Sequence, residues 1–212
     1  MSKHFLYVAD PMCSWCWGFS PVIGKVAEAF GDAAPVRVMV GGLRPGTTHA
    51  MRDKDKEYVK RHWHHVQEAS GQPFDFSFFD QDGFVYDTEP ACRAVVAARR
   101  IAPEKALAFL ARLHRAFYVE NRNTANEGVL ADIAAEFGFE REEFLKSLTD
   151  PETREETQGD FWFAQQSGIT GFPTLLAVED QKAYLVTAGF TPWETLEEPL
   201  AGWVAGEFAA EG

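Results

Sequence analysis

The chain has few cysteines, few cations and no long apolar run, and each shortage excludes a class of protein. Three cysteines in 212 residues are too few for a secreted scaffold held together by disulfides. The 20 lysines and arginines are outnumbered by 32 aspartates and glutamates, and the formal net charge of -12 argues against nucleic acid or an anionic membrane surface as a partner. No apolar run approaches the roughly 18 residues that cross a bilayer.

The start of the chain also lacks the pattern of a secretory signal. Met1-Ser2-Lys3-His4 leads directly into a short apolar run, without the longer apolar region of a signal peptide. We therefore expect a cytoplasmic protein. The hydrophobic fraction of 46% and the charged fraction of 25% are those of an ordinary globular protein, large enough for one sizeable domain or a domain with an insertion.

Two of the three cysteines stand together, in the segment Asp10-Pro-Met-Cys13-Ser-Trp-Cys16. The apolar run 4–9 before them is typical of a buried strand, and residues 14–30 after them carry apolar side chains at helical spacing. The pair is therefore expected where a strand passes into a helix. Free backbone N–H groups and the helix dipole favour an anion at this point, so Cys13 is expected to be partly thiolate near neutral pH.

The spacing of the pair suits disulfide exchange. Residues three apart at a helix start share a face within reach of a disulfide, with Cys13 further out and Cys16 covered by the first turn. Cys13 is then predicted to be the nucleophile and Cys16 the resolving thiol. The alternative is half of a zinc site, but the remaining cysteine, Cys92, has no second cysteine or histidine pair at ligand spacing. No metal is therefore expected.

The elements before and after the middle of the chain alternate between strand and helix patterns. Residues 36–40 form a second strand-like run, so the chain opens as β-α-β. Asp150-Pro151 predicts the start of a helix that runs to about Gln166. Residues 174–178 and 183–187 predict a hairpin with the loop Glu179-Asp180-Gln181-Lys182.

A last helix is expected after this hairpin. Thr191-Pro192-Trp193-Glu194 has the pattern of a capping box, and Pro199 should break or kink the helix that follows. Between residues 48 and 150 the apolar spacing is helical throughout, most clearly in 106–117 and 129–137.

This element order predicts an α/β protein with a thioredoxin fold interrupted by an inserted helical subdomain. Residues 1–47 would form the first part of the thioredoxin-like domain, residues 48–150 the helical insertion and residues 151–212 the second part.

The motif and the element order together resemble the DsbA family, and most closely its cytoplasmic FrnE-like branch. The segment from Asp10 to Gly18 is similar to the pattern D-P-x-C-x-W-C-[WY]-G of that branch, and Gly171-Phe172-Pro173-Thr174 resembles the cis-proline loop. The resemblance implies that the Phe172–Pro173 bond is cis and faces the cysteines, which leaves the Phe172 backbone free to pair with an extended substrate. On the residues alone, a proline before a strand is often only a rigid turn.

Residues around the cysteines are open to more than one interpretation. Asp10 either relays the proton of Cys16 or only caps a turn. Ser14 and Trp15 would tune the thiolate through hydrogen bonding and shielding. Met12, Trp15, Trp17 and Phe172 together would form an apolar apron for extended polypeptide, although Trp17 equally fits the core.

Two further features favour the plainer interpretation. Cys92 is more typical of a small buried side chain than of a third redox thiol. The histidines of Arg61-His62-Trp63-His64-His65 point apart on a helix, and a solvated face is the better interpretation.

The leading functional hypothesis is a thiol-disulfide oxidoreductase of protein disulfides, with isomerase activity included. Its partners would be disulfide-bearing or dithiol polypeptides, with no cofactor beyond glutathione or another thiol reductant or oxidant as co-substrate. One alternative is a glutathione-dependent isomerase or transferase of the 2-hydroxychromene-2-carboxylate isomerase or kappa-class type, whose members resemble this chain less because they typically carry a serine at the position of Cys13. Another is a peptide-binding module. The sequence leaves the oligomeric state and the direction of exchange open.

Overall fold

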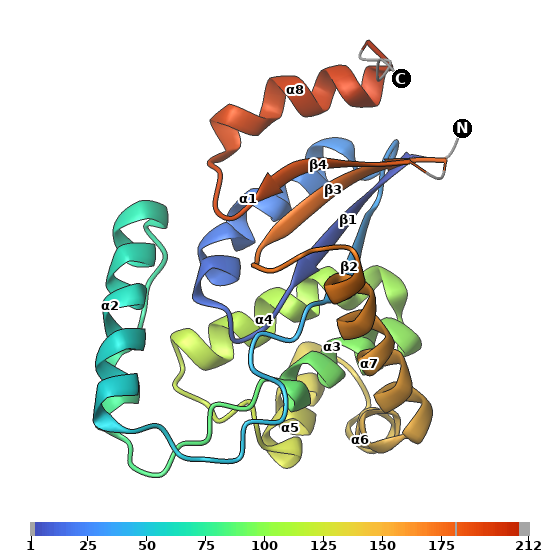
Figure 1. The fold of residues 1–212 in the computed structure, drawn as a ribbon. Helices are drawn as coiled ribbons and strands as arrows, with labels where there is room; N and C mark the ends of the chain where they lie inside the picture. The colour runs from blue at the N-terminus through green and yellow to red at the C-terminus, as the bar shows by residue number, and fades with distance from the viewer. Residues whose placement is uncertain (1–2, 181, 208–212) are drawn as a thin grey trace.

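A four-stranded sheet organises residues 3–180 and 182–207, the part of the chain that the computed structural model describes (Figure 1). Its order is β2 (Val36–Val40), β1 (Lys3–Ala9), β3 (Thr174–Glu179) and β4 (Lys182–Ala188). β1 pairs parallel with β2 and antiparallel with β3, and β3 pairs antiparallel with β4. The predicted hairpin is therefore present, although Gln181 in its loop lies outside the described residues.

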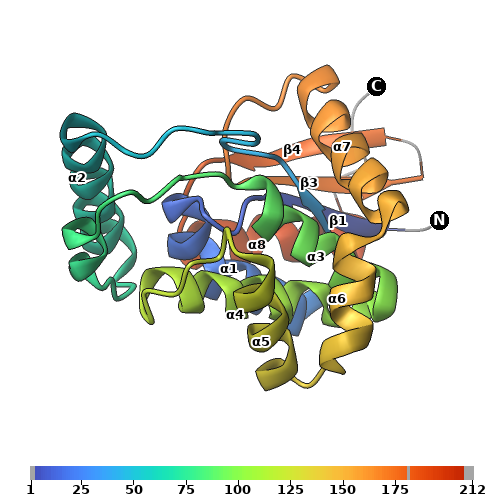
Figure 2. The same ribbon diagram turned by 90° about the horizontal axis from the view of Figure 1, so that it is seen from below.

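The helices surround this sheet. They are α1 (Ser14–Phe30), α2 (Asp53–Ser70), α3 (Glu89–Ile101), α4 (Ala106–Tyr118), α5 (Glu127–Phe137), α6 (Arg141–Thr149), α7 (Pro151–Gln166) and α8 (Trp193–Ala205), with 3-10 turns at Phe76–Asp80 and Pro103–Lys105. Helices α3, α4 and α7 contact β2, and α1 contacts both α4 and α8. Figure 2 shows α2 standing to one side of the other helices.

The predicted thioredoxin fold with added helices is confirmed by this topology. Between β2 and β3 the described residues form helices, 3-10 turns and an isolated bridge of Ala50 with Val85. The division into a thioredoxin-like domain and an insertion at residues 48 and 150 stays a prediction. The helices α3 and α4 of the predicted insertion pack directly against the sheet of the thioredoxin-like part.

Local sequence signals set several boundaries where they were expected. α1 and β2 begin and end at the predicted residues. α7 begins at Pro151, and the Asp150 side chain caps it by accepting a hydrogen bond of 2.8 Å from the Glu152 N–H. A proline at the first helical position costs no hydrogen bond, because that N–H has no partner inside the helix.

The last helix differs from the expectation in its cap and in its continuity, since Pro199 does not break it. Pro192 is the N-cap of α8 without a side-chain cap, and the Thr191 hydroxyl instead pairs with the Thr187 hydroxyl at 2.7 Å. Pro199 lies inside α8, and the helix continues to Ala205. Pro199 removes one helical hydrogen bond, but the buried Trp203 beyond it packs on Phe5 with ring centroids 5.1 Å apart and holds the helix against the sheet.

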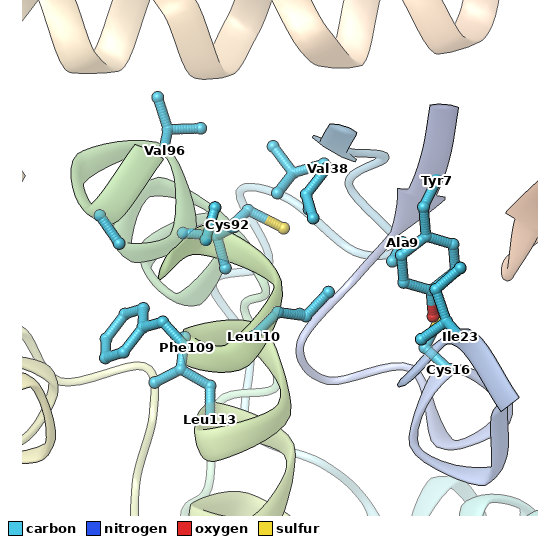
Figure 3. Packing of buried hydrophobic residues seen from close by; sticks show 14 of the residues in the cluster. Tyr7, Ala9, Cys16, Ile23, Val38, Cys92, Val96, Phe109, Leu110 and Leu113 are labelled. Carbon is cyan, nitrogen blue, oxygen red and sulfur yellow. The ribbon is translucent and has the colours of Figure 1, made fainter. Parts of the chain in front are cut away.

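The buried residues form two clusters. The larger one lies between the sheet, α1 and the helices α3 to α6, and Figure 3 shows part of it around Cys92, Val96 and Leu110. The second cluster is rich in aromatic rings and centres on Trp63 of α2, which is fully buried against Phe78, Phe79 and Tyr118. We call α2 with these rings the aromatic arm.

The aromatic arm should depend on Trp63 for its stability. Replacing Trp63 with alanine is expected to lower the free energy of unfolding by about 3–5 kcal/mol, because it removes a fully buried ring and leaves a cavity. Urea denaturation measures the loss. Tyr58→Ala on the exposed side of α2 is the matched control and should change stability by less than about 0.5 kcal/mol. Equal effects of the two changes would contradict the packing described.

Candidate active site

Cys13 and Cys16 are free thiols at the start of α1. Cys13 is the N-cap residue, with an extended backbone, and its carbonyl accepts the first helical hydrogen bond from the Trp17 N–H at 3.1 Å. Cys13 is 5% exposed and Cys16 is 0% exposed. Cys13 is thus the outer thiol and Cys16 the covered one, as the spacing of the two cysteines predicts.

The surroundings of the two thiols differ. The Cys13 thiol donates to the Phe172 carbonyl at 3.5 Å, on the far side of the opening. Burial raises the pKa of Cys16 well above its usual range, and the neighbouring Cys13 raises it further. The buried thiol therefore needs a group that removes its proton before it can attack a disulfide.

The loop opposite Cys13 is fixed by its own hydrogen bonds and by close packing. The Phe172–Pro173 peptide bond is cis. The Gly189 N–H donates to the Pro173 carbonyl at 2.7 Å, and the Thr174 hydroxyl donates to the Gly171 carbonyl at 2.9 Å. The Phe172 ring lies so close to Gly41 that a Cβ atom at that position would overlap it. The absence of a side chain at Gly41 therefore allows the loop that carries Phe172 to pack in this position. The sequence analysis did not single out Gly41.

Asp10 lies fully buried beneath the turn that carries Cys13. Its carboxylate accepts hydrogen bonds from the Met12 N–H at 2.8 Å, the Leu43 N–H at 2.7 Å and the Cys92 thiol at 3.3 Å. Burial raises its pKa, and these donors work in the opposite direction. The geometry supports the turn-fixing interpretation of Asp10, and its proton relay stays a prediction.

Cys92 is a buried residue of α3, in agreement with the plainer interpretation. Its thiol is not simply apolar packing, since it donates to the Asp10 carboxylate. Burial and the adjacent carboxylate raise its pKa well above the usual range for cysteine.

The apolar apron expected from Met12, Trp15, Trp17 and Phe172 forms only in part. Met12 and Trp17 are buried in the aromatic cluster, where the Trp17 indole donates to the Pro73 carbonyl at 3.0 Å. Their burial follows from the aromatic arm, which covers this side of α1. Trp15 is half-buried against Phe190, and Phe172 remains at the opening.

A hollow of about 480 Å³ opens beside Cys13. Ser14, Trp15 and Phe172 line it, together with Arg44, Tyr58 and His62, which come from the loop after β2 and from the aromatic arm. His62 therefore faces the candidate site rather than only a solvated surface, which the sequence analysis missed because it depends on how α2 packs.

Two larger hollows meet this one at Thr170 and Phe172. One of about 740 Å³ lies between the loop after β2 and α7, and one of about 580 Å³ lies between residues 167–172, which follow α7, and the strands β3 and β4. The exposed large hydrophobic side chains of the described residues are Leu43, Tyr58, Trp162, Phe163 and Leu185, and each lines one or more of the three hollows.

The described residues contain no cluster of three or more His, Cys, Asp and Glu side chains placed to hold a metal ion. None of their helices is both long enough and apolar enough to span a bilayer.

The strand order and the paired cysteines at the first helix place this chain in the class of thioredoxin-like proteins. More specifically, it belongs to the DSBA-like thioredoxin domain family, whose model matches residues 6–201.

Solved structures support this assignment. A candidate protein disulfide isomerase from Nitrosomonas europaea is 36% identical, with a TM-score of 0.91 over 98% of this chain and all of that chain. The cytosolic disulfide reductase DsbM from Pseudomonas aeruginosa is 29% identical, with a TM-score of 0.76 over 96% of both chains. DsbM has also been solved with GSH.

Curated relatives are more distant. The ClpXP adapter protein SpxH from Bacillus subtilis is 26% identical over 167 residues, which make up 78% of this chain and 55% of the relative. This chain thus spans little more than half the length of that adapter.

The contact between Gly41 and Phe172 gives a test of the site geometry. Gly41→Ala is expected to lower the free energy of unfolding by about 1–3 kcal/mol, because the added methyl group overpacks the Phe172 ring. Phe172→Ala should relieve most of that cost in the double variant. Urea denaturation of the four proteins of this cycle measures the coupling, and simple additivity of the two changes would contradict the contact.

Proposed function

We propose that this protein is a cytoplasmic thiol-disulfide oxidoreductase that exchanges disulfides of polypeptides through Cys13 and Cys16. The observation that carries the proposal is the placement of two free thiols at the start of α1, with the outer one facing the Phe172 carbonyl. The similarity to DsbM, a cytosolic disulfide reductase, supports both the disulfide chemistry and the cytoplasmic location that we propose.

The exchange begins at the outer thiol. The Cys13 sulfur, as a thiolate, attacks a substrate disulfide, forms a mixed disulfide and releases one substrate sulfur as a thiolate. Cys16 then loses its proton and attacks the Cys13 sulfur. The Cys13–Cys16 bond forms, the second substrate sulfur leaves, and the substrate has gained the two electrons that the cysteine pair has lost. The reverse sequence donates a disulfide.

The surface around the opening favours polypeptide substrates. We call Leu43, Tyr58, Trp162, Phe163 and Leu185 the apolar rim, since they surround the Thr170–Phe172 loop. Exposed apolar side chains gathered in one place indicate a binding surface. The side chains that line the two larger hollows carry no charge, which suits apolar segments of an unfolded polypeptide.

Glutathione suits the smaller hollow as a co-substrate. Arg44 and His62 line that hollow beside Cys13, and a guanidinium attracts carboxylates. The structure of DsbM with GSH supports a similar role here. Glutathione would then reduce the Cys13–Cys16 disulfide and return the protein to its dithiol form.

Redox titration tests the proposed function. The purified protein is equilibrated in glutathione buffers of graded poise, and the free thiols are alkylated and counted by mass spectrometry. We expect one two-electron transition that involves Cys13 and Cys16, with Cys92 unchanged because it is buried. Cys13→Ser is the control that removes the transition.

The same experiment separates the proposal from its alternative. A glutathione adduct at Cys13 alone, with no disulfide to Cys16 at any poise, would favour a glutathione-dependent isomerase or transferase. In that case Cys16→Ser would leave the glutathione-dependent isomerase or transferase activity intact. Disulfide exchange by the proposed route, in contrast, requires Cys16.

The apolar rim predicts a difference between large and small substrates. Trp162, which is 64% exposed, should contribute about 1–2 kcal/mol to polypeptide binding. Trp162→Ser is therefore expected to lower kcat/KM for an unfolded disulfide-bearing polypeptide about 5- to 30-fold and to leave the rate with glutathione disulfide within about twofold. Glu155→Gln, an exposed change on the same helix, is the control. Equal losses for both substrates would contradict the role of the rim.

A further inference from the structure

The three hollows that meet at Thr170 and Phe172 differ in charge and in their access to Cys13. The smallest, of about 480 Å³, is lined by Cys13 and by Arg44, whereas the described residues that line the two larger hollows include neither a cysteine nor a charged side chain. Among the described residues that line the smallest hollow, Arg44 is the only lysine or arginine, and no aspartate or glutamate is present. Its volume lies in the range of about 300–1,000 Å³ that is typical of sites for small molecules.

Arg44 is held in place without being neutralised. Its N–H donates to the Thr88 hydroxyl at 3.0 Å, and its carbonyl accepts from the Thr88 N–H at 3.3 Å. Its guanidinium carbon lies 5.1 Å from the ring centroid of Tyr86, which is itself buried and donates to the Met12 carbonyl. Most arginines of the described residues pair with a carboxylate, but Arg44 has no such partner among them. A fixed and unpaired guanidinium is suited to bind a carboxylate of a ligand.

His62, which also lines the smallest hollow, adds no charge near pH 7. Burial lowers the pKa of His62, and neighbouring charges, Arg61 and Arg44 among them, lower it further. The attraction of this hollow for an anion therefore comes from Arg44. The chain as a whole carries a formal net charge of -12, so this cation beside Cys13 does not belong to a generally basic surface.

A polypeptide cysteine capped by glutathione, that is, joined to it in a mixed disulfide, matches this arrangement. The glutathione half carries two carboxylates, and a guanidinium pairs strongly with a carboxylate. The polypeptide half suits the uncharged hollows, which are lined by the exposed Trp162 and Leu185. Of the three hollows, the one that contains Arg44 is also the one that Cys13 lines. The sulfur nearest to Cys13 would then be that of glutathione, and the polypeptide sulfur would be the leaving group.

We propose that this protein also removes glutathione from glutathione-capped polypeptide cysteines, with Arg44 as the residue that selects the glutathione half. The Cys13 thiolate attacks the glutathione sulfur, the bond between the two substrate sulfurs breaks, and the polypeptide sulfur leaves as a thiolate that takes a proton from water. A second glutathione, as a thiolate, then attacks the sulfur of the bound glutathione and frees the Cys13 thiolate. The net result converts a capped cysteine and one glutathione into a free cysteine thiol and glutathione disulfide.

This route does not require Cys16. Its thiol is fully buried, and its raised pKa keeps it protonated, so an external thiolate can attack the Cys13–glutathione disulfide first. The inference rests on the proposed function for the role of Cys13 as the nucleophile. The two are separable, because disulfide exchange between the protein and a polypeptide requires Cys16, whereas removal of glutathione does not.

One cysteine-containing apolar peptide, prepared with two different caps, tests the proposal. One cap is glutathione, and the other is 2-mercaptoethanol, which has no carboxylate. Release of the free peptide thiol is followed by mass spectrometry with glutathione as the reductant, and the rate without protein is subtracted. Because a hydrogen bond to a charged group is lost with the second cap, we expect kcat/KM to be about tenfold higher for the glutathione cap.

Three variants locate the origin of this preference. Arg44→Gln should lower the preference to about twofold or less, because it removes the charge that pairs with the carboxylate. Arg44→Lys should retain part of it, because it keeps the charge but not the planar guanidinium. Arg37→Gln changes an exposed arginine of β2 that lines none of the three hollows, and it should keep the full preference. The 2-mercaptoethanol cap reports misfolding, since a misfolded variant would lose activity with both caps.

Cys16→Ser completes the test. It should still remove glutathione from the capped peptide, within about threefold of the unchanged protein, and should no longer reduce the disulfide of an unfolded polypeptide. Loss of glutathione removal in Cys16→Ser, or an unchanged preference in Arg44→Gln, would overturn the inference. If the unchanged protein reduces the polypeptide disulfide but acts equally on both caps, the inference fails and the proposed function stands. If it acts on neither the capped peptides nor the polypeptide disulfide, the proposed function fails as well.

Discussion

The hydrogen bonding of one buried carboxylate holds together the segments that form the candidate redox site. Asp10 accepts from the turn before α1, from the loop after β2 and from the thiol of α3. Burying a carboxylate is unfavourable unless donors replace its water, and here three donors do so. Because those donors come from segments far apart in the sequence, one side chain sets the position of the Cys13 turn relative to the rest of the fold.

The two faces of the cysteine pair are chemically different. The outer face opens onto the apolar rim and the Phe172 loop, where a substrate sulfur must reach Cys13. On the inner face Cys16 lies fully buried beside Tyr7 and Asp10. A buried thiol is shielded from competing reagents, and the raised pKa of Cys16 keeps this thiol protonated. The outer face is therefore the side of α1 on which a substrate of the proposed exchange would bind.

Local sequence patterns correctly predicted the features that depend on neighbouring residues alone. The bounds of α1 and β2 follow from apolar periodicity, and the places of Cys13 and Cys16 follow from helix geometry. Predictions that depended on distant partners were less successful. The donors to Asp10 include Leu43 and Cys92, Thr191 pairs with Thr187 instead of capping α8, and the aromatic arm draws Met12 and Trp17 into the core. Nothing in the sequence around Trp162, Phe163 or Leu185 indicates that they meet beside one loop.

Met12 connects the turn that carries Cys13 to the aromatic arm. Its side chain is fully buried among the arm's rings, and its carbonyl accepts a hydrogen bond of 2.6 Å from the Tyr86 hydroxyl. Local opening of α2 would therefore also release the turn that carries Cys13. Segments that open together exchange their amide hydrogens together. The turn and the arm thus form one cooperative unit, in which the exchange protection of the cysteine turn follows the stability of a helix that contributes no sulfur.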